Sequence, residues 1–211
     1  MSKFINKIIT VLIVSDFFFN LGWGLMGPVF AIFIIQNITM GNIAESAKIA
    51  GFATFFYWIT KSLLQIPIGY YLDKNHGEKD DFQFLFIGTM MMAFVPLGYI
   101  IVTQAWHIYL LQIFYGLGAA MAIPPFAAIF TRHIDKGREA AAWSMYSTFL
   151  GIAVGVAGGI GGVTVAIFGF QYVFIFVSIF TIFSNILLFA IKDDISSKNK
   201  NVRRIPLEKT R

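Results

Sequence analysis

The sequence predicts an all-α integral membrane protein of six transmembrane helices, because its composition and its hydrophobic pattern both fit a bilayer. Of its 211 residues, 57% are hydrophobic and 13% are charged, whereas charged residues make up about a quarter of an ordinary soluble domain. Its 24 Phe and 19 Gly suit helices that meet lipid with bulky side chains and one another across small ones. Long apolar segments alternate with short connectors along the chain.

Each of six apolar segments is long enough to cross the hydrocarbon core, which takes about 20 mainly apolar residues in a helix. The first follows Lys3 and Lys7 and is too long for the apolar region of a cleavable signal, so we read it as a retained helix. The predicted spans are residues 8–35, 50–72, 82–102, 108–130, 140–167 and 170–191. Residues 1–192 then form one transmembrane bundle, and residues 193–211 form a basic tail.

The basic residues predict the direction of the helices. An even number of spans places both termini on one side, and fourteen of the sixteen Lys and Arg fall on that side: Lys3, Lys7, Lys74, Lys79, Arg132, Lys136, Arg138, Lys192, Lys198, Lys200, Arg203, Arg204, Lys209 and Arg211. By the positive-inside rule both termini are cytoplasmic, in a multi-pass protein of the cytoplasmic (bacterial inner) membrane. The net charge of +5 is thus an orientation signal, with recruitment of anionic lipid or a partner by the tail as the alternative, and no nucleic-acid partner is expected.

The sequence argues against an enzyme. It contains no cysteine, which excludes thiolate metal sites and a cysteine nucleophile. It also lacks a nucleotide-binding loop, a metal-spaced histidine cluster and a nucleophile with a nearby base. We therefore expect no cofactor and no metal.

Ionisable residues inside a membrane span are costly and usually functional, and the spans contain two of them, Asp16 and Lys61. Asp16, Asn20 and Trp23 recur at helical spacing in the first span, as do Tyr57, Lys61 and Gln65 in the second. We expect these two stripes to face a central cavity that carries substrate or ions. The span 82–102 has almost no polar residues, so we predict that it faces lipid and supports the bundle from outside.

The two charged residues should lie at different depths. In a hairpin that turns near residues 41–43, Lys61 is level with Trp23 near the bilayer midplane, and Asp16 lies about 10 to 14 Å closer to the cytoplasm. A direct Asp16–Lys61 pair is therefore not expected. Lys61 is a candidate to bind an anionic group of the substrate, or to be a charge that alternates between partners during transport. The alternative is a snorkelling lysine. Asp16 is a candidate proton carrier, or else a gate or helix-contact acid.

Several motifs resemble those of the major facilitator superfamily. Gly69, Asp73, Lys74 and Gly77, at the cytoplasmic end of the second span, are similar to the family's signature loop between helices 2 and 3. Gln112, in the fourth span, stands where an Arg is frequent in the family's fourth-helix motif, and the resemblance therefore implies that it belongs to the substrate or ion pathway. The segment 136–140 around Arg138 resembles the family's start of helix 5, and the segment 168–174 resembles its aromatic turn into helix 6.

This resemblance implies the N-terminal half of a transporter that has about twelve helices in two similar halves. The implied function is secondary active transport of a small solute by alternating access, with proton coupling as one possibility. Two bundles must then rock around one site, so we expect a homodimer or a separate second half. In such a dimer the resemblance places Asp73 of one copy near Arg138 of the other as a gate. A split transporter half, or a non-transporting assembly or sensor protein, is the alternative.

Overall fold

The protein is a bundle of long antiparallel helices. A computed structural model describes residues 6–75 and 77–198, and every regular element within them is helical, which confirms the all-α fold. The helices are α1 (Lys7–Met26), α2 (Phe30–Asn37), α3 (Ile43–Asn75), α4 (Glu78–Tyr99), α5 (Ala105–His133), α6 (Glu139–Phe168), α7 (Phe170–Leu188), the short 3₁₀ helix η1 (Phe189–Ile191) and α8 (Lys192–Lys198).

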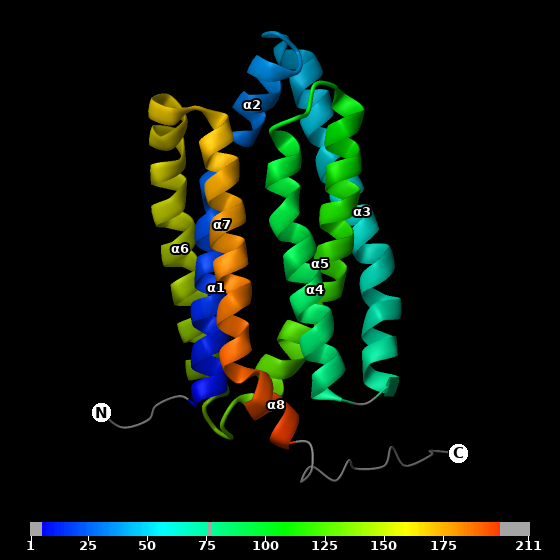
Figure 1. The fold of residues 1–211 in the computed structure, drawn as a ribbon, viewed down its shortest axis with the longest axis vertical. Coiled ribbons are helices and arrows are strands. Elements are labelled where there is room, and N and C mark those ends of the chain that lie inside the picture. The colour runs from blue at the N-terminus through cyan, green and yellow to red at the C-terminus, as the bar shows by residue number, and fades with distance from the viewer. Residues whose placement is uncertain (1–5, 76, 199–211) are drawn as a thin grey trace.

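The long helices run alternately up and down, so α1, α4, α6 and α8 all begin at the same end of the bundle (Figure 1). We call this the basic end, because it carries Lys7, Lys74, Arg132, Lys136 and Lys192. In the described residues, five helical stretches are long and apolar enough to cross a membrane: Lys7–Asn37, Glu78–Tyr99, Ala105–His133, Glu139–Phe168 and Phe170–Ile195. Helix α3 is long enough but more polar. The sixth span and the side on which the termini lie therefore stay predictions.

The first predicted span, residues 8–35, was wrong as a single helix. The structure breaks it after Met26 into α1 and α2. Pro28 explains the break, because proline has no backbone N–H and its ring clashes with the preceding turn of a helix. Helix α3 also begins seven residues before the predicted position 50, with its first turn capped by the Asn42 side chain, whose Oδ1 accepts the Glu45 N–H at 3.1 Å.

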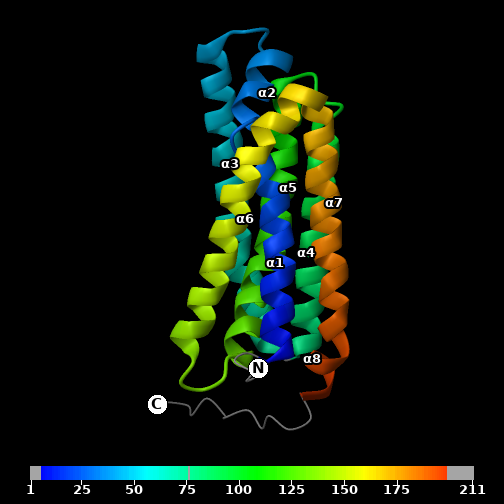
Figure 2. The ribbon, with the colours of Figure 1, turned by 90° about the vertical axis from the view of Figure 1, so that its left-hand side faces the viewer.

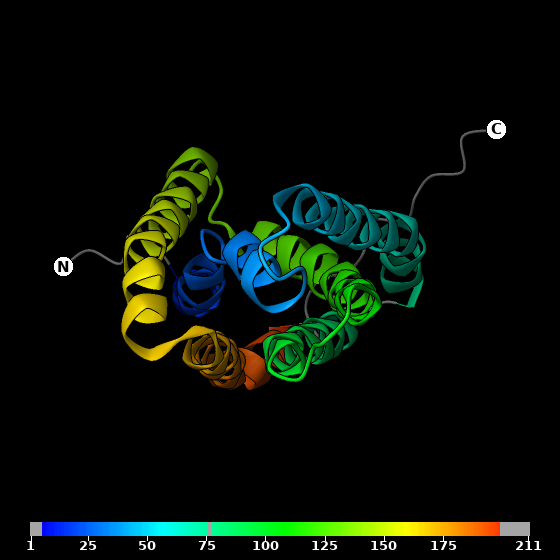
Figure 3. The ribbon, with the colours of Figure 1, turned by 90° about the horizontal axis from the view of Figure 1, so that it is seen from above.

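Two groups of three helices make up the bundle. Helix α1 packs against α6 and α7, helix α5 packs against α3 and α4, and α4 and α7 join the two groups. This pattern is unchanged when α1, α3 and α4 are exchanged for α5, α6 and α7, as expected of a structural repeat. Seen down the bundle, α6 and α3 lie on the two flanks of one face, with α1 and α5 between them (Figure 3).

The apolar core divides into two clusters. One is nearer the basic end and includes Leu12, Phe130 and Ile191, and the other is nearer the opposite end and includes Phe33 and Phe174. Hydrogen-bonded serines lie in the interior as well. The Ser15 hydroxyl donates to the carbonyl oxygen of Ser184 at 2.9 Å and lies 3.0 Å from the Ser184 hydroxyl. Because lone polar groups in an apolar interior are unfavourable, these bonds hold α1 against α7.

The predicted tail begins as part of the bundle. Helix α8 begins at residue 192, where the bundle was predicted to end, and crosses the basic end beneath α4 and α7 (Figure 2). Ile195 is buried, and the Lys7 ammonium group lies 2.7 Å from a carboxylate oxygen of Asp194. The remainder of the predicted tail, residues 199–211, and Lys3 lie outside the described residues.

Candidate functional site

A pocket of about 280 Å³ lies inside the bundle, between α1 on one side and α4 and α5 on the other. Helices α3, α6 and α7 complete its wall. The seventeen residues that line it are Ser15, Asp16, Phe19, Asn20, Tyr57, Leu85, Thr89, Met92, Tyr115, Ala119, Ala122, Ile123, Phe126, Tyr146, Leu150, Ser184 and Leu188. The pocket is thus mostly apolar and aromatic, with a few polar groups, as small-molecule sites usually are.

Asp16 is the charged residue of this lining. It lies near the middle of α1, and its carboxylate oxygen Oδ2 accepts a hydrogen bond from the Asn20 side-chain amide at 2.8 Å. The same amide donates to the backbone carbonyl of Asp16 at 2.8 Å. The Tyr146 hydroxyl, from α6, also hydrogen-bonds the carboxylate. Asp16 therefore has two neutral donors, and no basic side chain stands among the described residues of the lining.

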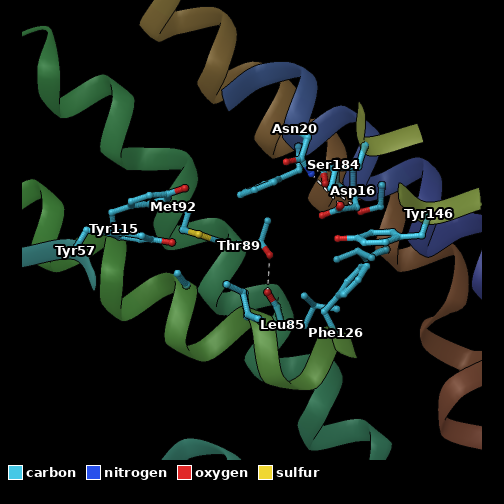
Figure 4. Close-up of a pocket in the computed structure, with 17 residues that line it drawn as sticks. Asp16, Asn20, Tyr57, Leu85, Thr89, Met92, Tyr115, Phe126, Tyr146 and Ser184 are labelled. Atoms are coloured by element: carbon cyan, nitrogen blue, oxygen red, sulfur yellow. Dashed lines mark hydrogen bonds between the residues drawn. The ribbon is translucent and has the colours of Figure 1, made fainter. Parts of the chain in front are cut away.

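A stack of aromatic rings forms the opposite side of the pocket. The Tyr115 ring, from α5, stacks on Tyr57 of α3 with centroids 4.7 Å apart and on Trp23 of α1 with centroids 4.1 Å apart. Figure 4 shows Tyr57 and Tyr115 facing Asp16 and Tyr146 across the pocket, with Thr89 between the two sides. The Thr89 hydroxyl donates to the carbonyl oxygen of Leu85 at 2.8 Å.

The structure brings together only part of the predicted pathway. Asp16, Asn20 and Tyr57 line the pocket. The ring of Trp23 stacks on Tyr115, which is one of the lining residues. Lys61 and Gln65 lie on α3 away from the lining, although both are partly buried.

Two predicted pathway residues have other neighbours. The Lys61 ammonium group lies 4.4 Å above the centroid of the Trp58 ring, on the half-exposed side of α3. The Gln112 side-chain amide donates to the Tyr99 hydroxyl at 3.0 Å in the buried core. Asp16 and Lys61 form no ion pair in the described part of the chain.

The predicted gating residues lie at the basic end. Gly69 and the exposed Asp73 and Lys74 belong to the last turns of α3, and Gly77 precedes the first turn of α4. Arg138 precedes α6 on the other flank and borders a small cavity of about 30 Å³.

A partly buried ion pair joins the start of α4 to the end of α5 near these residues. The Arg132 guanidinium, at the end of α5, hydrogen-bonds a carboxylate oxygen of Asp81, whose side chain is 3% exposed. Asp73 is close enough to act electrostatically on Asp81. The signature loop is thus adjacent to a charge pair that fixes α4 to α5.

Several lining residues were missed from the sequence, above all Tyr146, Thr89 and Ser184. The prediction that residues 82–102 only support the bundle from the lipid side was wrong, because Leu85, Thr89 and Met92 of α4 line the pocket. Those three residues recur at spacings of four and three, which is the same kind of helical spacing that relates Asp16, Asn20 and Trp23 in the first span.

Comparison with known proteins agrees with these features. A profile of the Major Facilitator Superfamily matches residues 12–210. An uncharacterised MFS-type transporter of Methanocaldococcus jannaschii is 24% identical over 205 residues, which are 97% of this chain and 50% of that protein. The chain therefore spans about half the length of this curated relative. Because the profile covers nearly all of it, the chain belongs to the major facilitator superfamily.

Proposed function

We propose that this chain is one half of a secondary active transporter, which moves a small solute across the cytoplasmic membrane by alternating access around the pocket at Asp16. The observation that carries the proposal is a carboxylate in the middle of a membrane-spanning helix that faces a pocket of about 280 Å³. An acid at that depth is costly, by about 2.5–3.5 kcal/mol on insertion scales, and is retained chiefly on substrate or ion pathways. Family membership supports transport, and not catalysis, as the activity.

Asp16 is also the candidate for ion coupling. Its described hydrogen-bond partners, Asn20 and Tyr146, are both neutral, so nothing in the lining balances its charge permanently. A proton or a cationic solute can therefore neutralise it in turn. In proteoliposomes we expect Asp16→Asn to abolish accumulation driven by a pH gradient, while counterflow exchange persists at a solute concentration high enough to saturate the variant. Unchanged pH-driven accumulation in this variant would remove Asp16 from the coupling path.

A second six-helix bundle is needed for alternating access, and we propose that a second copy of the chain supplies it. The face between the flanks α3 and α6 (Figure 3) presents α1 and α5, which carry most of the pocket. A two-fold axis normal to the membrane brings α3 of one copy against α6 of the other.

The surface of α6 suits such a contact. A side-chain carbon added at Gly151, Gly155 or Gly158 would meet no heavy atom within 4 Å, so this face is open to close approach by another helix. The negatively charged Asp73 at the end of α3 then approaches the start of α6 near Arg138, where the helix dipole favours an anion.

Cysteine crosslinking tests this arrangement, helped by a cysteine-free chain. Cysteines at Asp73 and Arg138 should form an intermolecular disulfide in oxidised membranes. The matched control pairs Asp73 with Phe189, which lies between α7 and α8 at the same end but packs against Phe82 of α4, and should give no dimer. If the first pair also fails and the purified chain is monomeric in nanodiscs, the homodimer is wrong. A different six-helix half then becomes the partner, an alternative favoured by the half-length match to the relative.

A further inference from the structure

We propose that the pocket binds an organic cation, namely a small protonated amine with an aromatic or other apolar body. This inference rests on the proposed function and names the substrate class of the same site. It follows from the charge of the lining, from the hydrogen-bond roles of its polar groups and from the placement of its aromatic rings.

The charge of the lining is negative. Asp16 contributes the carboxylate, and the pocket contains no Lys, Arg or His among its described lining residues. The lysine that could have favoured an anion, Lys61, lies over Trp58 outside the lining. In a site of low dielectric a second anion beside Asp16 is repelled, whereas a cation is attracted.

The polar groups around Asp16 and Thr89 mainly offer acceptors. A carboxylate has about four acceptor positions, and Asn20 and Tyr146 occupy two of them at Asp16. Asn20 donates its amide to Asp16 and so retains its carbonyl oxygen. Thr89 donates its hydroxyl proton to Leu85 and so presents only lone pairs. An ammonium group, which has donors and no acceptor, complements this set better than a hydroxyl or a carboxylate does.

The aromatic rings suit both the charge and the body of such a ligand. Phe19, Phe126 and Tyr146 stand among the lining residues with the stacked pair Tyr57 and Tyr115. Cations are attracted to aromatic faces, and the stacked pair offers a flat surface for an aromatic or apolar body. Since that pair faces Asp16 across the pocket (Figure 4), a ligand can place its ammonium group at Asp16 and its body against the tyrosines.

Binding to the 211-residue chain in lipid nanodiscs, followed by calorimetry at neutral pH, tests this inference with three probes of one shape: 2-phenylethylammonium, 2-phenylethanol and phenylacetate. We expect the ammonium probe to bind at least tenfold more tightly than the alcohol and phenylacetate not to bind. Asp16→Asn should reduce the affinity for the ammonium probe to that for the alcohol. The matched control Glu45→Gln removes a carboxylate at the opposite end of the bundle, which pairs with Lys48 at 3.7 Å, and should leave all three affinities unchanged.

The inference is overturned if the ammonium probe fails to bind at millimolar concentration, if the alcohol or phenylacetate binds as well, or if Asp16→Asn keeps full affinity. The order of the three affinities is measured on the wild-type protein. It therefore tests the inference even if the Asp16→Asn protein does not accumulate. Tyr57→Leu, which removes one stacked ring, should weaken ammonium binding several-fold. Flux of a solute without cation preference would refute this inference and leave the transporter standing. Cation-selective binding without flux in proteoliposomes that contain only this chain would refute the transporting homodimer and leave this inference standing.

Discussion

Helix α6 rests on α1 at Gly161, and a single methyl group there should separate the two helices. A Cβ atom added to Gly161 would lie 2.2 Å from the carbonyl oxygen of Leu25 and 2.9 Å from its carbon. Non-bonded atoms pack best at about 3.5–4.0 Å, so Gly161→Ala requires a shift of about 1 Å or more. The obstacle is backbone, which cannot rotate away as a flexible side chain can.

The adjacent glycine supplies the matched control. A Cβ atom at Gly162 would meet no heavy atom within 4 Å. Overpacking of a close contact costs about 1–3 kcal/mol, whereas Gly→Ala in an open helix position gains up to about 1 kcal/mol from helix propensity. We therefore expect Gly161→Ala to lower the free energy of unfolding by about 1–3 kcal/mol and Gly162→Ala to leave it unchanged or raise it slightly.

Reversible unfolding of the two variants in mixed detergent micelles, followed by circular dichroism, measures this difference. Because α6 carries Tyr146 to Asp16, Gly161→Ala should also reduce ammonium binding at the pocket, whereas Gly162→Ala should not. Equal stability of the two variants would show that α6 does not approach α1 at Leu25 as closely as the structure indicates.

Three further substitutions test other parts of the structure. Lys61→Met should leave protein abundance intact and abolish flux in vesicles, and full flux would reduce Lys61 to a snorkelling lysine. Tyr146→Phe removes a hydrogen bond to the carboxylate of Asp16, a loss of about 1.5–3 kcal/mol that should appear as a lower free energy of unfolding, and an unchanged value would argue against this bond. Arg132→Ala leaves the buried Asp81 without its ion-pair partner and should destabilise the protein by about 1–3 kcal/mol, measured by unfolding, whereas an unchanged midpoint would argue against the pair.

The helices themselves were readable from the sequence, because lipid imposes long apolar segments. One exception was the break at Pro28. The apolar residues continue there without interruption, although α1 ends at Met26 and α2 begins at Phe30. The extension of α3 was missed for the opposite reason: its first two turns contain Glu45 and Lys48, and hydropathy cannot identify a helix that continues beyond the apolar region.

The depth of residues was also partly readable. The hairpin argument predicted Lys61 level with Trp23, but the structure stacks Trp23 and Tyr57 on the same ring of Tyr115, one helical turn away from Lys61. The same reasoning extends to α6, which runs parallel to α1 (Figure 1). Asp16 lies about 14 Å into α1 and Tyr146 about 10 Å into α6 at 1.5 Å per residue, so counting from the helix ends at the basic end could have found the Asp16 partner.

The role of α4 could not be read from hydropathy, because lipid chains are as apolar as Leu and a stripe such as Leu85 and Met92 is the same whether it faces lipid or a pocket. Small residues carry the missing information. A Cβ atom at Gly88 would lie 2.5 Å from the carbonyl oxygen of Gly118, and one at Gly118 would lie 2.8 Å from that of Gly88. The two glycines therefore mark where α4 and α5 cross, and Thr89, next to this crossing, is directed into the pocket. In a membrane bundle, a glycine pair with no space for a side chain locates the interior more reliably than the hydrophobicity of the residues around it.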